Sequence, residues 1–255
     1  MNRNIDNVCL VPSSLLLPEI SYKYREVNDR LLSCLENNEI WFAKLQSFND
    51  PFEPARIFSG TPYGNMLKND IDESGILCLC KSNLNLAMWS YYGNGLRGIA
   101  IGYNTEYFLR TLEPVKLHKN EYNPRWRYVF DMKYDDNELG PIEEMSLLFN
   151  NEMTDLERQK MFATKSNVYS HEDEFRIVIK PQVTFLDENP ESQWLSTSGL
   201  YKHSQDSIKE IIFGELCSKL DRQRIKQILA NRKINYKEVV RSKNSFTIEL
   251  RDDLE

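Results

Sequence analysis

The chain has 255 residues, 41% of them hydrophobic and 11% aromatic, so it can fill a sizeable core and wholesale disorder is excluded. Its net charge of -6 argues against a generally basic binder of nucleic acid or membranes, although a local basic groove is still compatible with it. The five Cys residues lack C-x-x-C spacing and the His partners of a zinc site, so we expect buried thiols and no metal site. No signal peptide and no apolar window of about 18 residues is found, which predicts a cytoplasmic protein without membrane contact.

In the N-terminal half, residues 1–19 are predicted to form a flexible leader and residues 20–255 a single domain. Alternating or apolar runs predict strands at Ile20–Arg25, Ile40–Ala43, Ile76–Cys80 and Gly98–Tyr103. Helices are predicted at Asp29–Glu36, between the cap Asn28 and the stop Asn37-Asn38, and at Leu84–Tyr92, which ends at Gly93.

In the C-terminal half, the charged segment from Lys116 to Thr164 is harder to interpret. One or two strands are predicted around Arg127–Lys133 and a helical stretch over Ile142–Ala163. The remaining predicted elements are strands at Glu174–Lys180, Lys209–Phe213, Lys237–Val240 and Phe246–Leu250 and a helix at Asp221–Asn231. This mixed order, without repeats or linkers, favours an α+β fold over regular βαβ winding.

The first segment that could carry chemistry is Tyr22–Arg25 (YKYR). The planar guanidinium of Arg25, on an early strand beside a helix N-terminus, is suited to hold a diphosphate, with Tyr24 as a neighbouring cofactor-binding candidate. The simpler interpretation is an edge strand whose cations face solvent.

The second segment joins the strand that ends at Ser82 to a short helix bearing Trp89 and Tyr92. Aromatic faces stack on flat rings and attract cationic ones such as nicotinamide, so the segment could form a pocket floor. Alternatively, both aromatics are core packing for the helix.

The third segment contains Glu172 and Glu174, which should point to the same side at the mouth of a strand, with Arg176 continuing that face. Neighbouring carboxylates repel each other, and such a pair suits the stabilisation of an oxocarbenium-like centre. The alternative is a solvated acidic turn paired with Arg176 or Lys165.

The rigid turn at Asn49-Asp50-Pro51 also has two interpretations. Pro51 fixes its own φ and pushes Asp50 out of the helical region. The turn could be a structural lock in which Asn or Asp side chains bond nearby amides, which we favour. It could also line a site, so Asn49 and Asp50 are secondary candidates.

Several of these motifs, in order, resemble a widespread bacterial family of unknown function. They are Tyr-Lys-Tyr-Arg, Ile-Trp-Phe-Ala, Ser-Phe-Asn-Asp-Pro-Phe-Glu, Met-Trp-Ser-Tyr-Tyr-Gly, Gly-Ile-Ala-Ile, Lys165-Ser166, Glu-x-Glu-x-Arg and Glu-Ile-Ile-Phe-Gly. The likeness covers roughly residues 20–250, and the Phe-Asn-Asp-Pro-Phe-Glu block is its most specific part. Within that family, residues 116–164 would be an insertion that governs substrate choice.

A more distant resemblance is to the ADP-ribosyltransferase superfamily of the Arg/Ser/Glu type. It implies a split central β-sheet with flanking helices and NAD as the substrate. Arg25 would hold the NAD phosphates or ribose, and Ser82 would brace the Glu pair. Glu174 would bind the nicotinamide ribose and stabilise the cation, while Glu172 would orient the acceptor. In this chain Cys78-x-Cys80-x-Ser82 stands where those enzymes have Ser-Thr-Ser.

The leading hypothesis is therefore an NAD-dependent ADP-ribosyltransferase, a toxin or antiviral defence effector that modifies a protein or nucleic-acid acceptor, or else hydrolyses NAD. A cognate regulator or antitoxin would be a possible partner. The second hypothesis is a non-catalytic sensor or regulatory module, motivated by the departure from Ser-Thr-Ser. The third is a metal-dependent nuclease using Asp50, Glu53, Glu172 and Glu174, although these lack a recognisable spacing for a metal nuclease.

Overall fold

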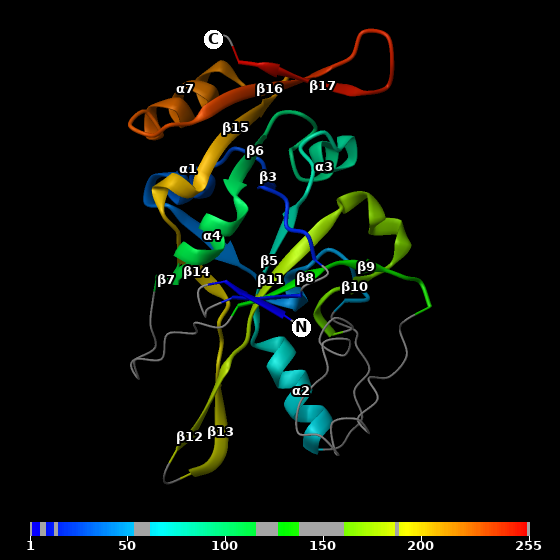
Figure 1. Cartoon of the computed structure of the whole chain (residues 1–255), viewed down its shortest axis with the longest axis vertical. Helices are drawn as coiled ribbons and strands as arrows, with labels where there is room; N and C mark the ends of the chain where they lie inside the picture. The colour runs from blue at the N-terminus through cyan, green and yellow to red at the C-terminus, as the bar shows by residue number, and fades with distance from the viewer. Residues whose placement is uncertain are drawn as a thin grey trace.

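The fold is built around one large, mixed β-sheet (Figure 1). The computed structural model describes residues 2–5, 9–12, 15–53, 62–115, 127–137, 161–186 and 189–253. In sheet order the ten strands are β1 (Asn2–Ile5), β2 (Cys9–Pro12), β8 (Arg127–Asp131), β11 (Glu174–Ile179), β5 (Gly75–Cys80), β3 (Ile20–Arg25), β6 (Ile99–Asn104), β15 (Ile208–Gly214), β16 (Asn235–Arg241) and β17 (Ile248–Asp252). The pairs β2–β8 and β15–β16 are parallel and the others are antiparallel, so the predicted mixed α+β class is confirmed.

The large sheet consists of two halves that meet at one point. Strands β3 and β5 are neighbours in the sheet, yet they pair only at Tyr22 and Cys80. Elsewhere β3 pairs along its whole length with β6, and β5 does so with β11. The two strands therefore separate on either side of this contact, and the separation creates room for a cleft.

Three smaller sheets complete the strand structure. In the first, β14 (Gly199–Lys202) lies between β4 (Glu39–Phe42) and β7 (Glu113–Pro114). The second pairs β9 (Lys133–Tyr134) with β10 (Thr164–Lys165), and the third is the hairpin of β12 (Gln182–Leu186) and β13 (Asn189–Leu195).

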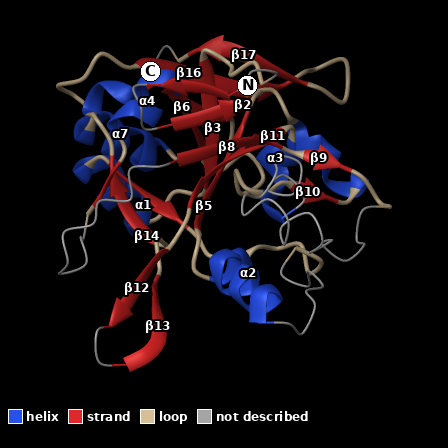
Figure 2. Ribbon diagram, turned by 60° about the horizontal axis from the view of Figure 1, so that its bottom comes forward, coloured by secondary structure: helices blue, strands red, loops and turns tan. Residues whose placement is uncertain are grey.

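Helices lie on both faces of the large sheet (Figure 2). They are α1 (Asp29–Asn37), α2 (Pro62–Asp72), α3 (Leu86–Tyr91), α4 (Thr105–Thr111) and α7 (Lys219–Ile228), with 3-10 turns η1 (Leu45–Ser47), η2 (Asn167–Glu172) and η3 (Gln205–Ser207). None of the helices that the structure describes is both long and apolar enough to cross a bilayer.

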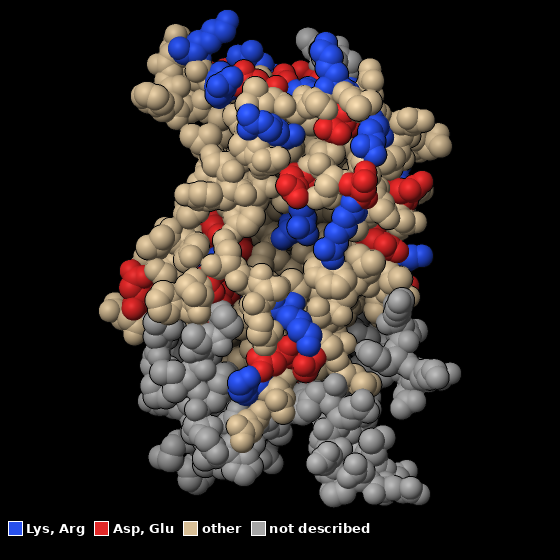
Figure 3. Space-filling view, turned by 180° about the vertical axis from the view of Figure 1, so that it is seen from behind, with Lys and Arg blue, Asp and Glu red and all other residues tan. Residues whose placement is uncertain are grey.

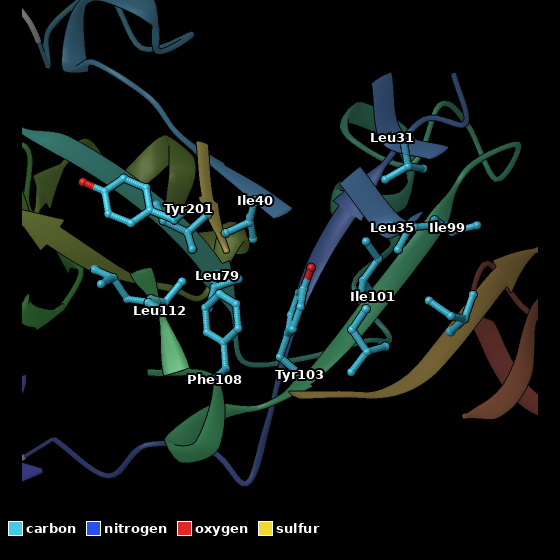
Figure 4. Packing of buried hydrophobic residues seen from close by; sticks show 14 of the residues in the cluster. Leu31, Leu35, Ile40, Leu79, Ile99, Ile101, Tyr103, Phe108, Leu112 and Tyr201 are labelled. Atoms are coloured by element: carbon cyan, nitrogen blue, oxygen red, sulfur yellow. The ribbon is translucent and has the colours of Figure 1, made fainter. Parts of the chain in front are cut away.

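Strand alternation assigns the side chains of the sheet to different cores. Ile99, Ile101 and Tyr103 of β6 pack with α1, α4 and α7 in the largest cluster (Figure 4), whereas Ala100 joins a cluster with α3 on the other face. Each fully buried aliphatic or aromatic side chain contributes about 1.5–3 kcal/mol, so these clusters hold the helices against the sheet.

The predicted elements of the N-terminal half are confirmed with small shifts. Strand β3 has the predicted bounds, and α1 begins after Asn28, whose side chain accepts a hydrogen bond from the Leu31 amide at 2.9 Å. Asn38 ends the helix in the left-handed conformation with φ 56°. Residues 1–19, predicted to be a flexible leader, include β1 and β2, which form one edge of the sheet.

Elsewhere the outcome is mixed. The predicted strand Phe246–Leu250 appears as Ile248–Asp252, and the predictions omitted α2, α4 and the β12–β13 hairpin. Of the predicted helical stretch Ile142–Ala163, only residues 161–163 lie within the described part of the chain.

Candidate functional site

A cavity of about 280 Å³ opens where β3 and β5 separate. It is lined by Lys23, Tyr24 and Arg25 of β3, by Ile76, Leu77, Cys78 and Cys80 of β5, and by Trp41, Ala43, Ser47, Phe48, Asn49, Met88, Tyr92, Lys165, Glu172, Glu174 and Arg176. The lining therefore combines apolar walls with a small group of convergent charges, which is typical of ligand sites.

The buried charged side chains at one end of the cavity form a network that we call the charged floor: Glu53, Lys165, Glu172, Glu174 and Arg176. Arg176 is at its centre. It points from β11 and is only 1% exposed. Its guanidinium binds both oxygens of Glu53, at 2.5 and 3.0 Å, and donates two further bonds to Oε1 of Glu174, at 3.1 and 2.8 Å. A fifth bond reaches the Phe162 carbonyl at 2.8 Å, so the Arg176 side chain is held in one position.

Lys165 is the second buried cation and connects the acidic residues. Its ammonium lies 2.6 Å from Glu172 and 3.5 Å from Glu53. The other oxygen of Glu172 accepts a hydrogen bond from the Tyr92 hydroxyl at 2.8 Å, and Asn49 donates to the same hydroxyl at 2.8 Å. Both oxygens of Glu172 are thus occupied.

Glu174 differs from Glu172 because only one of its oxygens is used. Both bonds from Arg176 end on Oε1, and Oε2 forms no hydrogen bond within the described residues. Burial alone would raise the pKa of Glu174, but Arg176 and Lys165 hold it below its usual value. The group is therefore a carboxylate at neutral pH, with one oxygen left for a ligand.

The expected geometry of the acidic pair is only partly correct. Glu174 and Arg176 do share a face of β11, as strand alternation predicts. Glu172, however, belongs to η2 rather than to the strand, and Asp173 between the two adopts a left-handed conformation with φ 42°. This turn brings Glu172 to the cavity, so the two carboxylates converge because of the turn and not because of the side-chain alternation of a strand.

Arg25, Tyr24, Tyr92 and Asn49 also line the cavity, as proposed from the sequence. Tyr24 packs edge-on against Trp89 and donates its hydroxyl to the Ser82 carbonyl at 2.8 Å. The four residues come from β3, from the C-terminus of α3 and from the loop after η1, so their convergence depends on the tertiary fold.

Three other candidates lie apart from the cavity lining. The Ser82 hydroxyl accepts a bond from the Leu84 amide in a local turn, so it does not brace the Glu pair. Trp89 is fully buried and donates to the Asn83 carbonyl, as a core residue would. Asp50 is buried and accepts from the Phe52 amide at 2.9 Å, which is the structural lock that we favoured.

Sequence reasoning did not place Lys23, Glu53, Lys165 and Arg176 among the site candidates of the leading hypothesis. A usable signal was present for Arg176, because Phe175 and Ile177 predict a buried strand and a buried guanidinium requires carboxylate partners. No comparable signal identified Glu53 as that partner, because 123 positions separate the two residues.

The cysteines of β5 are unreactive wall residues. Cys78 and Cys80 are free thiols in the cavity lining. Burial is the main reason why the pKa of Cys78 rises to about 12 and that of Cys80 also rises. Both therefore stay protonated at neutral pH. Across the described ranges, no group of three or more His, Cys, Asp or Glu side chains has the arrangement of a metal site.

Comparisons with known proteins give one match. Neither the curated proteins nor the solved structures contain a match to this chain. Residues 88–177, however, match a family described as "Protein of unknown function (DUF2971)". This segment includes Lys165, Glu172, Glu174 and Arg176, which form most of the charged floor, and Tyr92, which donates a hydrogen bond to Glu172. Over that segment, the chain is similar to an uncharacterised protein family.

Proposed function

We propose that the chain is an NAD-consuming enzyme that transfers ADP-ribose to an acceptor or to water. The observation that carries the proposal is the open Oε2 of the Glu174 carboxylate inside a cavity that also contains Lys23 and Arg25. A carboxylate beside cations suits a substrate that develops positive charge on a sugar and carries negative charge on phosphates.

The reaction requires cleavage of the bond between the ribose C1′ and the nicotinamide nitrogen. The bonding electrons leave with nicotinamide, which becomes neutral, and the ribose becomes an oxocarbenium-like cation. Glu174 would stabilise this cation and accept a hydrogen bond from the ribose hydroxyl. An acceptor nucleophile or water then bonds to C1′ and releases a proton.

The charged floor supports this role because it fixes Glu174 before the substrate binds. Arg176 orients the carboxylate through Oε1, and Glu53 holds Arg176 from the other side. Such preorganisation avoids rearrangement in the transition state. Glu172 is bound to both Lys165 and Tyr92, so we assign it to positioning the cavity wall rather than to contact with the acceptor.

The decisive experiment compares wild type with Glu174→Gln in an assay for nicotinamide release from NAD, with and without a cell lysate as the acceptor source. Glutamine keeps the shape and an oxygen for Arg176 but removes the negative charge. We expect a loss of about 10²–10³-fold in rate, the usual effect of removing one transition-state contact.

The matched control is Glu249→Gln, which changes an exposed glutamate paired with Arg251 on β17. It should release nicotinamide at the wild-type rate. Equal rates for wild type and Glu174→Gln, or no release by wild type above the buffer background with any acceptor, would refute the proposal. The expected role as a toxin or defence effector stays a prediction.

A second candidate function, a regulatory module that binds its ligand without turnover, is favoured by two observations. Ser82 lies outside the cavity lining, and both oxygens of Glu172 are already occupied. Stoichiometric binding of NAD without release of nicotinamide, unchanged in Glu174→Gln, would support this alternative.

A further inference from the structure

A second cavity of about 250 Å³ adjoins the first. We call the cavity with Glu174 the inner cavity and this one the outer cavity. The outer cavity lies over α1, β4 and β6, and its wall includes Arg30, Glu39 and His203. The two cavities share Lys23, Arg25 and Trp41, so these three residues mark their junction.

The cations at the junction are available to a ligand. The Lys23 ammonium donates one hydrogen bond, to the Cys78 carbonyl at 2.8 Å, and thereby bridges the gap between β3 and β5. Among the described residues neither Lys23 nor Arg25 forms an ion pair, in contrast to Lys165 and Arg176. Burial and the nearby Arg25 also lower the pKa of Lys23, so an anion placed here would stabilise the Lys23 ammonium.

Charge in the inner cavity favours an anion as well. Its lining contains the cations of Lys23, Arg25, Lys165 and Arg176 but only the carboxylates of Glu172 and Glu174. Glu53, behind the lining, pairs with Arg176, so four cations face three carboxylates, and Lys23 and Arg25 are the two cations of this group that form no ion pair among the described residues. Figure 3 shows a hollow in the middle of one face, with Lys and Arg side chains beside it and Asp and Glu side chains interspersed among them.

The outer cavity offers a surface for a planar ring. The guanidinium of Arg30 lies 4.9 Å from the centre of the Trp41 ring. Trp41 is nevertheless 37% exposed, although it is a large aromatic residue on a strand. A stacked guanidinium and indole that are both open to solvent can bind a flat base by stacking.

We propose that Lys23 and Arg25 form a diphosphate clamp at the junction, and that the outer cavity takes the second ring-bearing half of the ligand against Trp41. The ligand class is then a dinucleotide, or a nucleoside diphosphate joined to a sugar, rather than a nucleoside or a mononucleotide. The inference rests on the proposed function for the identity of the half in the inner cavity, but it does not depend on turnover.

The test is calorimetric titration of the full chain with ADP-ribose, inorganic pyrophosphate and adenosine at fixed ionic strength. Lys23→Met should weaken ADP-ribose and pyrophosphate by about tenfold or more, the usual effect of losing a charged hydrogen bond, and leave adenosine unchanged. Lys23→Arg should restore most of the affinity. Trp41→Ala should weaken ADP-ribose and adenosine but not pyrophosphate.

Lys243→Met is the matched control, because Lys243 is an exposed lysine in the turn between β16 and β17. This variant should bind all three probes with the affinity of wild type. Urea unfolding of each variant verifies that it is folded, and Lys23→Gln replaces Lys23→Met if the latter is not. The clamp would be overturned if wild type bound neither ADP-ribose nor pyrophosphate. It would also be overturned if wild type and the folded Lys23 variant bound them with equal affinity.

The two proposals fail separately. If wild type releases nicotinamide but its ADP-ribose affinity is unchanged by substitution of Lys23 and Trp41, the clamp is refuted and the proposed enzymatic function stands. If ADP-ribose binding depends on both residues but no nicotinamide is released, the clamp stands and the proposed enzymatic function is refuted.

Discussion

Arg176 shows how a single buried charge organises the candidate site. Its guanidinium is surrounded by Glu53, Glu174 and the Phe162 carbonyl, and Glu53 is itself only 1% exposed. The nearby carboxylates raise the pKa of Arg176 against the effect of burial, so the cation persists at every physiological pH. Removing it would leave the buried carboxylates of Glu53 and Glu174 without their main partner, while Lys165 is already paired with Glu172.

We therefore expect Arg176→Met to lower the free energy of unfolding by about 3–5 kcal/mol, because it leaves an uncompensated charge in the interior. Urea unfolding at pH 7 measures this change. The control, Arg251→Met, breaks an exposed pair with Glu249 and should unfold close to the wild-type midpoint. A near-wild-type midpoint for Arg176→Met would show that the buried network is not a structural requirement.

At the scale of elements, the site depends on how α3 is joined to η2. Asn85 caps α3 by accepting from the Met88 amide at 3.1 Å, and its side-chain nitrogen donates to the His171 carbonyl in η2. Tyr92, just after α3, bonds to Glu172 at the end of η2. One asparagine thus fixes both the start of the helix and its distance from the acidic turn.

Asn85→Ala should destabilise the protein by about 2 kcal/mol, since it removes both the cap and the bridge, whereas Asn85→Asp keeps the cap and should cost about 1 kcal/mol. Urea unfolding separates the two variants, and ADP-ribose binding should weaken in both because Glu172 and Tyr92 shift. Asn104→Ala, which removes the equivalent cap of α4, serves as the control. It should lose a similar amount of cap stability but bind ADP-ribose normally, and equal effects on binding would argue against the bridge.

At the scale of the whole molecule, an acidic protein places two cations at the junction of its two cavities. The net charge is -6, but the junction of the two cavities presents Lys23 and Arg25 without an ion pair in the described part of the chain. A small anion interacts mainly with these two cations, whereas a long polyanion is also repelled by the net charge of -6 of the whole chain. The distribution of charge therefore favours a small phosphorylated ligand over a nucleic-acid duplex.

From this distribution we expect no binding of a labelled 30-base-pair DNA duplex in fluorescence anisotropy at 150 mM salt, because too few phosphates would be neutralised. ADP-ribose should still bind under these conditions. Micromolar affinity for the duplex, or cleavage of DNA or RNA on addition of magnesium, would instead revive the nuclease hypothesis.

The sequence alone determined the local structure wherever one signal was sufficient. The alternation of Ile20–Arg25 and the cap at Asn28 specify β3 and the start of α1, because these signals act between neighbouring residues. It also identified Arg25, Tyr92, Glu172 and Glu174 as candidates for a site, and all four line the inner cavity. For α4 it failed, because seven residues with mixed polarity carry little periodic signal.

Only the tertiary structure decided which of these residues meet. Glu53 reaches Arg176 across 123 positions, Ser82 turns away into a local turn, and β3 separates from β5 after a single pair. Such outcomes depend on how two half-sheets pack, and therefore on the sum of many weak contacts between distant segments. Local periodicity does not contain information about contacts between distant segments, so the cleft and the junction of its two cavities could be identified only from the tertiary structure.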